Sequence, residues 1–348
     1  MLDTLPTLLD DQPSCSAKIA MCLNQAALVE AARGDAARAN AICDVHLHWV
    51  NRLASQHDYG YYELAIQPWI NKGRLRRREK LGRSALEHFS LIQRYLAREP
   101  LVLGPCLVSY DTCAQIMEHN PSILSTLRNT YVVDSLKTFF GALEFDDALI
   151  FVRRERDKDL CRDTELLVEG ELIGLLGARR FAQACKLSAT SRGDHVSCSV
   201  VYLLYQGLSL SGLREVAKAR VLARELAAFV EATELDFFSQ STALRYLYSL
   251  ASLLEQLREE HDAFSMFEKG YQLALAVDDQ LFSIKFMTAL ARLSGRVEAA
   301  DWRSRRAGVL QECHYAEILR AEGVTGPAGG TQIFDDLSTY IFRNLAPP

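Results

Sequence analysis

The amino-acid sequence predicts an all-α fold built from stacked helical hairpins, and three observations support that prediction. Apolar residues recur three and four positions apart over long segments, which is the period of an amphipathic helix. Only 9 prolines and 19 glycines interrupt the 348 residues, and they cluster between those segments. Small residues recur at a spacing near 36 residues, as expected for one hairpin per repeat.

Composition excludes several classes of protein. The chain carries 44 acidic and 39 basic residues, so its net charge of −5 argues against a globally basic nucleic-acid binder. A hydrophobic content of 49% argues against disorder. The 9 cysteines show no CxxC pair, and the N-terminus has no basic segment followed by an apolar run. These features predict reduced thiols and a cytoplasmic protein without a membrane span.

The N-terminal part, 19–129, is predicted to be helical but irregular. Residues 1–18 form a lead-in, and the first hairpin is expected over 19–55 with its turn at Gly34–Asp35. In the following segment, HDYGYYELAIQPWINKG, Pro68 predicts an interrupted helix, because proline lacks the N–H donor. Further helices are expected over 74–98, 107–120 and 121–130, the last two separated at Asn120–Pro121.

Residues 130–322 form the most regular part. Each predicted second helix opens with a small residue, where close approach of two helices favours alanine: Ala148, Ala184, Ala219, Ala263 and Ala300 here, and Ala39 in the first hairpin of the N-terminal part. From Ala148 onward these residues are 36, 35, 44 and 37 positions apart. Apolar positions accompany them in each repeat, for example Leu172, Leu175 and Phe181 before Ala184. This spacing predicts an array of helical hairpins.

The pattern resembles the tetratricopeptide repeat in its period and in its small and apolar positions. The resemblance implies a right-handed superhelix of stacked hairpins, a TPR-like α-solenoid with elongated, degenerate repeats. The family's aromatic residue at the start of the first helix and its closing proline are missing. An irregular helical bundle is the alternative.

The C-terminal part, 323–348, contains a linker, GVTGPAGG, and then a predicted amphipathic helix with Phe334, Leu337 and Ile341 on one face. This helix would either cap the array or dock into a partner, a second copy of the chain or the chain's own groove.

Motifs for catalysis and metal binding are missing from the sequence. No GxSxG, HExxH or GxxxxGK[ST] pattern occurs. The clusters around Cys43–His48 and Glu312–Glu317 offer too few ligands on one helix face for zinc. Paired acids at Asp146–Asp147, Glu259–Glu260 and Asp278–Asp279 are expected in turns or at helix starts, where the helix dipole favours acids. We therefore expect no metal and no cofactor.

The most concentrated charge is a basic patch in the segment KGRLRRREKLGR. Its basic residues are Lys72, Arg74, Arg76, Arg77, Arg78, Lys80 and Arg83. Aromatic residues that would stack on bases are not interleaved, so a solvated helix face or a contact with an acidic partner is favoured over nucleic acid. The neighbouring Tyr59, Tyr61, Tyr62 and Trp69 are interpreted as packing between helical layers, with a recognition patch as the alternative.

The resemblance also implies which residues line the concave groove. The groove-facing positions of the family correspond here to Asn24, Lys137, Glu169, Arg245, Tyr248, Glu255, Gln256, Lys285 and Arg292. Arg245, Lys285 and Arg292 fall in adjacent repeats, which predicts a basic stretch of groove for a carboxylate or an acidic peptide, with Tyr248 beside it.

These observations favour a non-enzymatic, regulatory scaffold that recognises a peptide segment or a partner protein. A small-molecule sensor on the same superhelix is the second hypothesis, and an all-helical enzyme is the third.

Overall fold

The computed structural model describes residues 13–54, 62–97, 99, 101–103, 106–108, 121–157, 164–191, 196–295 and 302. These residues are helical apart from one small hairpin of strands, which confirms the predicted all-α class. The chain divides into two units: unit 1 contains residues 1–142 and 158–162, and unit 2 contains residues 143–157 and 163–348.

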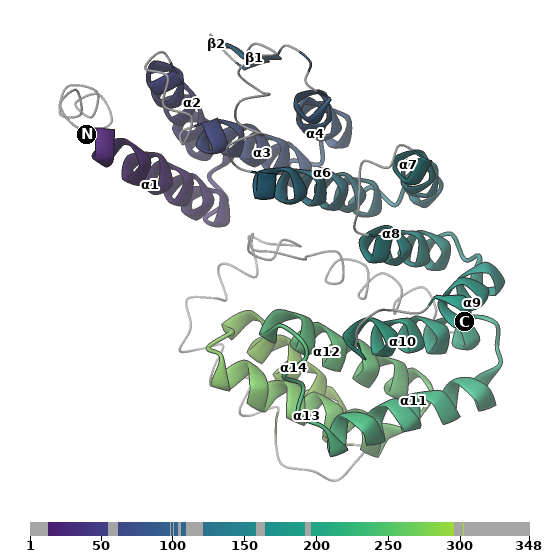
Figure 1. Cartoon of the computed structure of the whole chain (residues 1–348). Coiled ribbons are helices and arrows are strands. Elements are labelled where there is room, and N and C mark those ends of the chain that lie inside the picture. Colours follow the sequence, from purple (N-terminus) through teal and green to yellow (C-terminus); the bar gives the residue numbers. More distant parts are fainter. Residues whose placement is uncertain are drawn as a thin grey trace. The chain divides into compact units, whose positions relative to one another are not determined.

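Unit 1 is a layer of antiparallel helices in which each helix packs against the next (Figure 1). Its helices are α1 (Pro13–Ala32), α2 (Ala36–Ala54), α3 (Tyr62–Arg78), α4 (Gly82–Leu96) and α6 (Pro121–Gly141). Helix α3 also contacts α1 and α6, so the first helices of successive hairpins touch one another. The strands β1 (Leu101–Leu103) and β2 (Cys106–Val108) pair antiparallel, with Leu101 opposite Val108.

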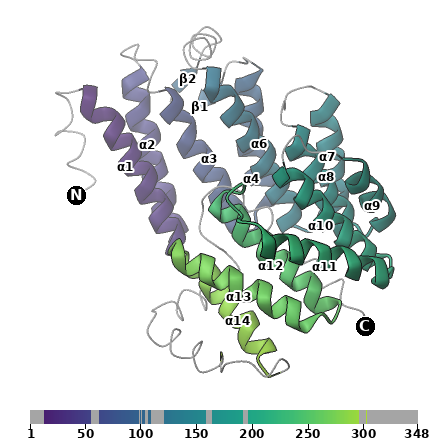
Figure 2. The same cartoon turned by 60° about the horizontal axis from the view of Figure 1, so that its bottom comes forward.

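Unit 2 continues the hairpin pattern, and Figure 2 shows α12, α13 and α14 side by side. Its helices are α7 (Phe145–Asp157), α8 (Thr164–Gly177), α9 (Phe181–Thr190), α10 (Val196–Gly212), α11 (Val216–Ala232), α12 (Gln240–Gln256), α13 (Glu260–Ala276) and α14 (Gln280–Leu293). Consecutive helices pack together, and α10 also contacts α8 and α12.

Three expected boundaries in the N-terminal part were wrong. Helix α3 runs through Pro68, which is buried, so packing on α2 and α4 compensates for the missing backbone hydrogen bond. The helix expected over 74–98 is the end of α3 and the whole of α4. Residues 107 and 108 belong to β2, whereas 109–120 lie outside the described residues.

Proline marks two helix starts in the structure. Helix α6 begins at Pro121, as expected, and α1 begins at Pro13 rather than near residue 19. Proline is favoured in the first turn of a helix, because a backbone N–H there has no intrahelical acceptor and its loss breaks no hydrogen bond. Residues 1–12 and the predicted C-terminal helix lie outside the described residues.

The same type of turn recurs between consecutive helices along the chain. Its defining residue has a left-handed backbone with φ between 56° and 82°, at Gly34, Lys80, Leu143, Arg179, Arg214, Arg258 and Asp278. At Arg258 the amide donates to the Glu255 carbonyl at 3.0 Å, and the Glu259 amide donates to the Leu254 carbonyl at 2.9 Å. These two bonds satisfy carbonyls at the end of the first helix, as in a Schellman motif.

A buried alanine follows each of the first six turns by five residues. These alanines are 0% exposed and are Ala39, Ala85, Ala148, Ala184, Ala219 and Ala263. Five of them were predicted from the spacing, and Ala85 was missed. The predicted Ala300 lies outside the described residues.

In unit 2, phenylalanine rings pack on glycines at the ends of first helices. Phe181 begins α9 and Gly212 ends α10, where an added Cβ would lie 2.5 Å from Phe181 Cδ1. Phe145, the first residue of α7, covers Gly177 at the end of α8 in the same manner. The absence of a side chain at these glycines makes room for the ring.

The turn geometry predicts opposite effects for two substitutions. Gly34→Ala should lower the free energy of unfolding by about 1 kcal/mol, because a Cβ is disfavoured at left-handed φ although nothing lies within 4 Å of it. Arg258→Gly should raise it by about 0.5 kcal/mol, because the same backbone strain is relieved. Urea denaturation of both variants tests the pair, and two changes of the same sign would contradict it.

Candidate functional site

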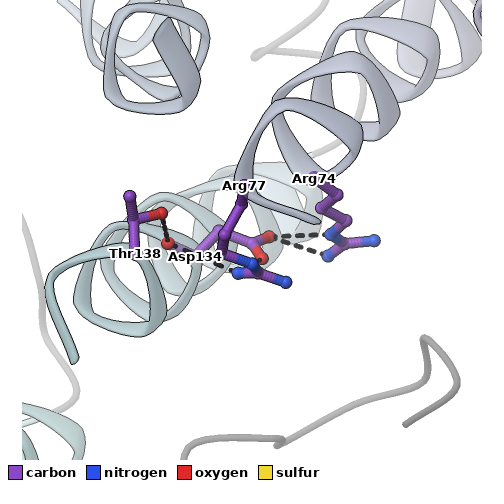
Figure 3. Close-up of polar contacts among 4 residues, drawn as sticks. All are labelled: Arg74, Arg77, Asp134 and Thr138. Atoms are coloured by element: carbon purple, nitrogen blue, oxygen red, sulfur yellow. Dashed lines mark hydrogen bonds and ion pairs between the residues drawn. The ribbon is translucent and has the colours of Figure 1, made fainter. Parts of the chain in front are cut away.

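Two residues of the predicted basic patch bind a carboxylate that the sequence prediction did not include. Arg74 and Arg77, near the end of α3, both bind Asp134 on α6 (Figure 3). Arg74 donates from Nε to Oδ2 at 3.0 Å and forms an ion pair with the same oxygen through Nη2 at 2.8 Å, and Arg77 donates from Nη1 to Oδ1 at 2.8 Å. The two arginines therefore join α3 to α6.

Asp134 is 1% exposed, so its charge depends on these partners. Burial alone would raise the pKa of Asp134, but the charges of Arg74 and Arg77 outweigh it and hold the pKa below its ordinary value. The carboxylate consequently stabilises the fold above about pH 4 and loses that contribution as the pH falls further. Thr138 donates its hydroxyl to the Asp134 carbonyl at 2.7 Å.

The other members of the basic patch face different neighbours. Lys72 pairs with Asp44 of α2 and lies 5.9 Å from the centre of the Trp69 ring. Arg76 pairs with Glu79 at 3.0 Å, and Arg83 lies 3.7 Å from Glu87. Arg78 is half-buried, and Lys80 is exposed at the turn. The patch is thus divided among several contacts.

In unit 1 the predicted groove residues lie on first helices. Asn24 of α1 accepts a hydrogen bond from Asn71 of α3 at 2.6 Å. Lys137 is half-buried, three residues after Asp134 on α6. Asn71, which the sequence prediction did not include, is buried and extends the polar contacts between first helices.

In unit 2 two predicted groove residues are brought together: Arg292 of α14 pairs with Glu255 of α12. Glu169 of α8 accepts from the Tyr205 hydroxyl of α10 at 3.1 Å, and burial, followed by the Glu169 charge, raises the pKa of Tyr205. Gln256 is half-buried at the end of α12. Like the contacts of unit 1, these join the first helices of neighbouring hairpins.

The predicted basic stretch of groove is only partly accessible. Arg245 is 5% exposed. Tyr248 packs edge-on against Phe267 and Phe286, with ring centres 5.6 and 5.7 Å apart. Lys285 lies 4.9 Å above the Phe282 ring. Lys285 and Arg292 are therefore the accessible cations of this stretch. A charge-reversing substitution at Arg245 would disturb a buried position rather than a contact with a ligand.

A second contact between α8 and α10 was also missed. Cys198 donates to Glu165 at 2.8 Å, and Glu165 lies one helical turn before Glu169 on α8. Burial and this hydrogen bond raise the pKa of Cys198 to about 11, so the thiol stays protonated and unreactive at neutral pH. The separations of 33 and 36 residues, close to one repeat, are the sequence signal that could have identified both pairs.

The side chains of the Cys43–His48 segment are divided between a buried and an exposed side of α2. Cys43 and His46 are buried, whereas Asp44 and His48 are exposed. Within the described ranges, no three His, Cys, Asp or Glu side chains are grouped so that they could hold a metal ion. The Glu312–Glu317 segment lies outside those ranges.

His46 should make the stability of unit 1 depend on pH. It is 1% exposed, its Nε2 has no hydrogen-bond partner among the described residues, and burial lowers its pKa to about 4. The unfolded chain binds this proton near pH 6.5, so stability should fall by up to about 3 kcal/mol between pH 6.5 and 4. Urea denaturation across this range should show a flatter profile for His46→Leu, with His48→Gln as the control that keeps the wild-type slope. An unchanged slope for His46→Leu would contradict the assignment.

Among the described helices, none is long and apolar enough to cross a membrane. The chain matches no protein-family model and no curated protein.

Proposed function

We propose that this chain is a non-enzymatic binding scaffold of tetratricopeptide-like hairpins that holds a peptide segment or partner protein along its first helices. The observation that carries the proposal is the recurrence of one turn, one buried alanine and one kind of contact between first helices. Arrays of such hairpins form extended concave surfaces, and the first helix of each hairpin lines the inner wall.

The spacing of the polar contacts in unit 2 supports an array. Cys198–Glu165, Tyr205–Glu169 and Arg292–Glu255 join residues that are 33, 36 and 37 positions apart. Each contact links a first helix to the first helix of the next hairpin. A run of such contacts produces one continuous wall rather than a closed core.

Exposed side chains along this wall offer both apolar and charged contacts. Val196 and Leu203 on α10 are 58% and 38% exposed, although both are large and apolar. On α14, Lys285, Thr288 and Arg292 share one face and are at least partly exposed. An amphipathic peptide with acidic residues would satisfy both regions.

Site-specific photo-crosslinking in the native cell tests this proposal. A photoreactive amino acid replaces Leu203 or Thr288 on first helices, and Ile150 or Val221 on second helices as matched exposed controls. We expect the first-helix positions to capture a common protein and the second-helix positions to capture none of it. Equal capture at all four positions would contradict the proposal, and a small molecule as the only co-purifying ligand would favour the sensor hypothesis instead.

A further inference from the structure

The arginines bound to Asp134 retain donors that Asp134 does not use. A guanidinium carries five N–H groups, and Arg74 and Arg77 direct only some of them at the carboxylate. Among the described residues, neither guanidinium has another hydrogen-bond partner. Figure 3 shows one nitrogen of each group pointing away from Asp134.

The helices that carry this pair are strongly basic. Helices α3 and α6 contain seven basic and two acidic residues, a net charge of +5 in a chain whose total is −5. The basic residues are Lys72, Arg74, Arg76, Arg77, Arg78, Arg128 and Lys137, and the acidic residues are Glu63 and Asp134. Lys137 is close enough for its charge to act on the Asp134 carboxyl group. Asp44 and Glu79 pair with Lys72 and Arg76, so seven basic residues face four acidic ones and a charge of +3 remains. A second anion would therefore meet a positive field.

Asp134 also fixes the two arginines in position. Their side chains are 31% and 18% exposed, so a ligand can reach them although the carboxylate between them is buried. Ordering a mobile arginine side chain on binding costs side-chain entropy. Arg74 and Arg77 are already ordered by Asp134 in the folded protein, so ligand binding loses less entropy. Arginine forks suit the planar oxygens of carboxylates and phosphates.

We propose that Arg74 and Arg77 form a receptor for an oxyanion, a carboxylate or a phosphate carried by an acidic peptide segment of the partner, with Asp134 as the positioning residue. This inference rests on the proposed function, because it places the acidic contact of the bound segment on unit 1.

Unit 2 supplies a matched pair for comparison. Arg224 binds Glu259 through Nε at 2.9 Å, and Arg220 shares the same carboxylate. There, a second acid, Asp262, lies 3.9 Å from Arg224, so two acids balance two arginines. The pair in unit 2 has no excess positive charge with which to attract an anion.

Fluorescence anisotropy with labelled hexaglutamate and with a labelled phosphoserine peptide, at low salt, tests the proposal. The double variant Arg74→Gln with Asp134→Asn keeps the net charge of the protein. It should weaken peptide binding about tenfold, because it removes one of the two guanidinium groups of the receptor. The corresponding exchange Arg224→Gln with Glu259→Gln should leave affinity unchanged. The tighter of the two peptides identifies the oxyanion. Equal weakening by both exchanges would overturn the proposal.

Chemical protection of the wild-type protein provides a test without variants. Phenylglyoxal modification, measured by mass spectrometry, should slow at Arg74 and Arg77 when the peptide is bound and stay constant at Arg220 and Arg224. Binding without that protection would overturn the receptor and leave the scaffold proposal standing. Absence of binding by either peptide would also overturn the receptor, whereas the photo-crosslinking experiment decides the scaffold separately.

Discussion

Asp134→Asn is expected to lower the free energy of unfolding by about 3 kcal/mol, because removing one partner of a buried ion pair leaves the other charges without compensation. Arg74 and Arg77 would then face each other across a neutral amide. Both side chains are partly exposed and can turn toward water, which keeps the loss near the lower end of the usual range. Hydrogen exchange should show the largest increase at the contact between α3 and α6.

Asp146→Asn is the matched control for this substitution. Asp146 also pairs with an arginine, Arg180, but both side chains are largely exposed. Exposed pairs contribute little, so the control should lose less than about 1 kcal/mol. Urea denaturation gives both values. A loss at Asp134 no greater than that at Asp146 would show that the buried carboxylate does not hold α3 to α6.

Gly177→Ala is expected to lower the free energy of unfolding by about 2 kcal/mol, because the new methyl group would overlap the ring of Phe145. Phe145 is 6% exposed and has little room to move. Gly174, one turn earlier, is crowded as well, since a Cβ there would lie 2.9 Å from Leu149 Cδ2. The contact between α7 and α8 must therefore open to accommodate the substitution.

Gly141→Ala, at the end of α6, separates this overlap from the general effect of replacing a helical glycine. Nothing lies within 4 Å of a Cβ at Gly141, so that variant should gain about 0.5 kcal/mol from higher helix propensity. Combining Gly177→Ala with Phe145→Leu should restore part of the lost stability. Thermal denaturation of the wild type, the two single variants and the double variant completes a double-mutant cycle. Additive losses in the double variant would refute the overlap.

The hairpins of unit 2 could be predicted because their alanines recur at a nearly constant spacing. The hairpin of α3 and α4 was missed since its turn uses Lys80, a residue that does not mark a left-handed backbone in a sequence. Pro68 misled the prediction in the same region, because local propensity is outweighed where a helix is packed on both sides. The turn geometry is therefore more constant than the residues that adopt it.

The site was less predictable than the fold. A repeat pattern identifies positions on first helices, which is how Glu255 and Arg292 were both named. It does not say which of these positions are buried, and Arg245 is only 5% exposed. Asp134 is the one acidic residue of α6, and its role is visible only when its partners, 57 and 60 residues earlier, are known.

The sequence separation of the polar contacts also determines when each can form during synthesis. In unit 2 the partners that join hairpins lie at most 39 residues apart, so each new hairpin finds its contacts on the one just made. Arg74 must await Asp134, 60 residues later, and until then the basic end of α3 lacks its carboxylate. The hairpins of unit 2 can thus close one after another, whereas the Arg74–Asp134 contact of unit 1 closes only after α6 has been translated.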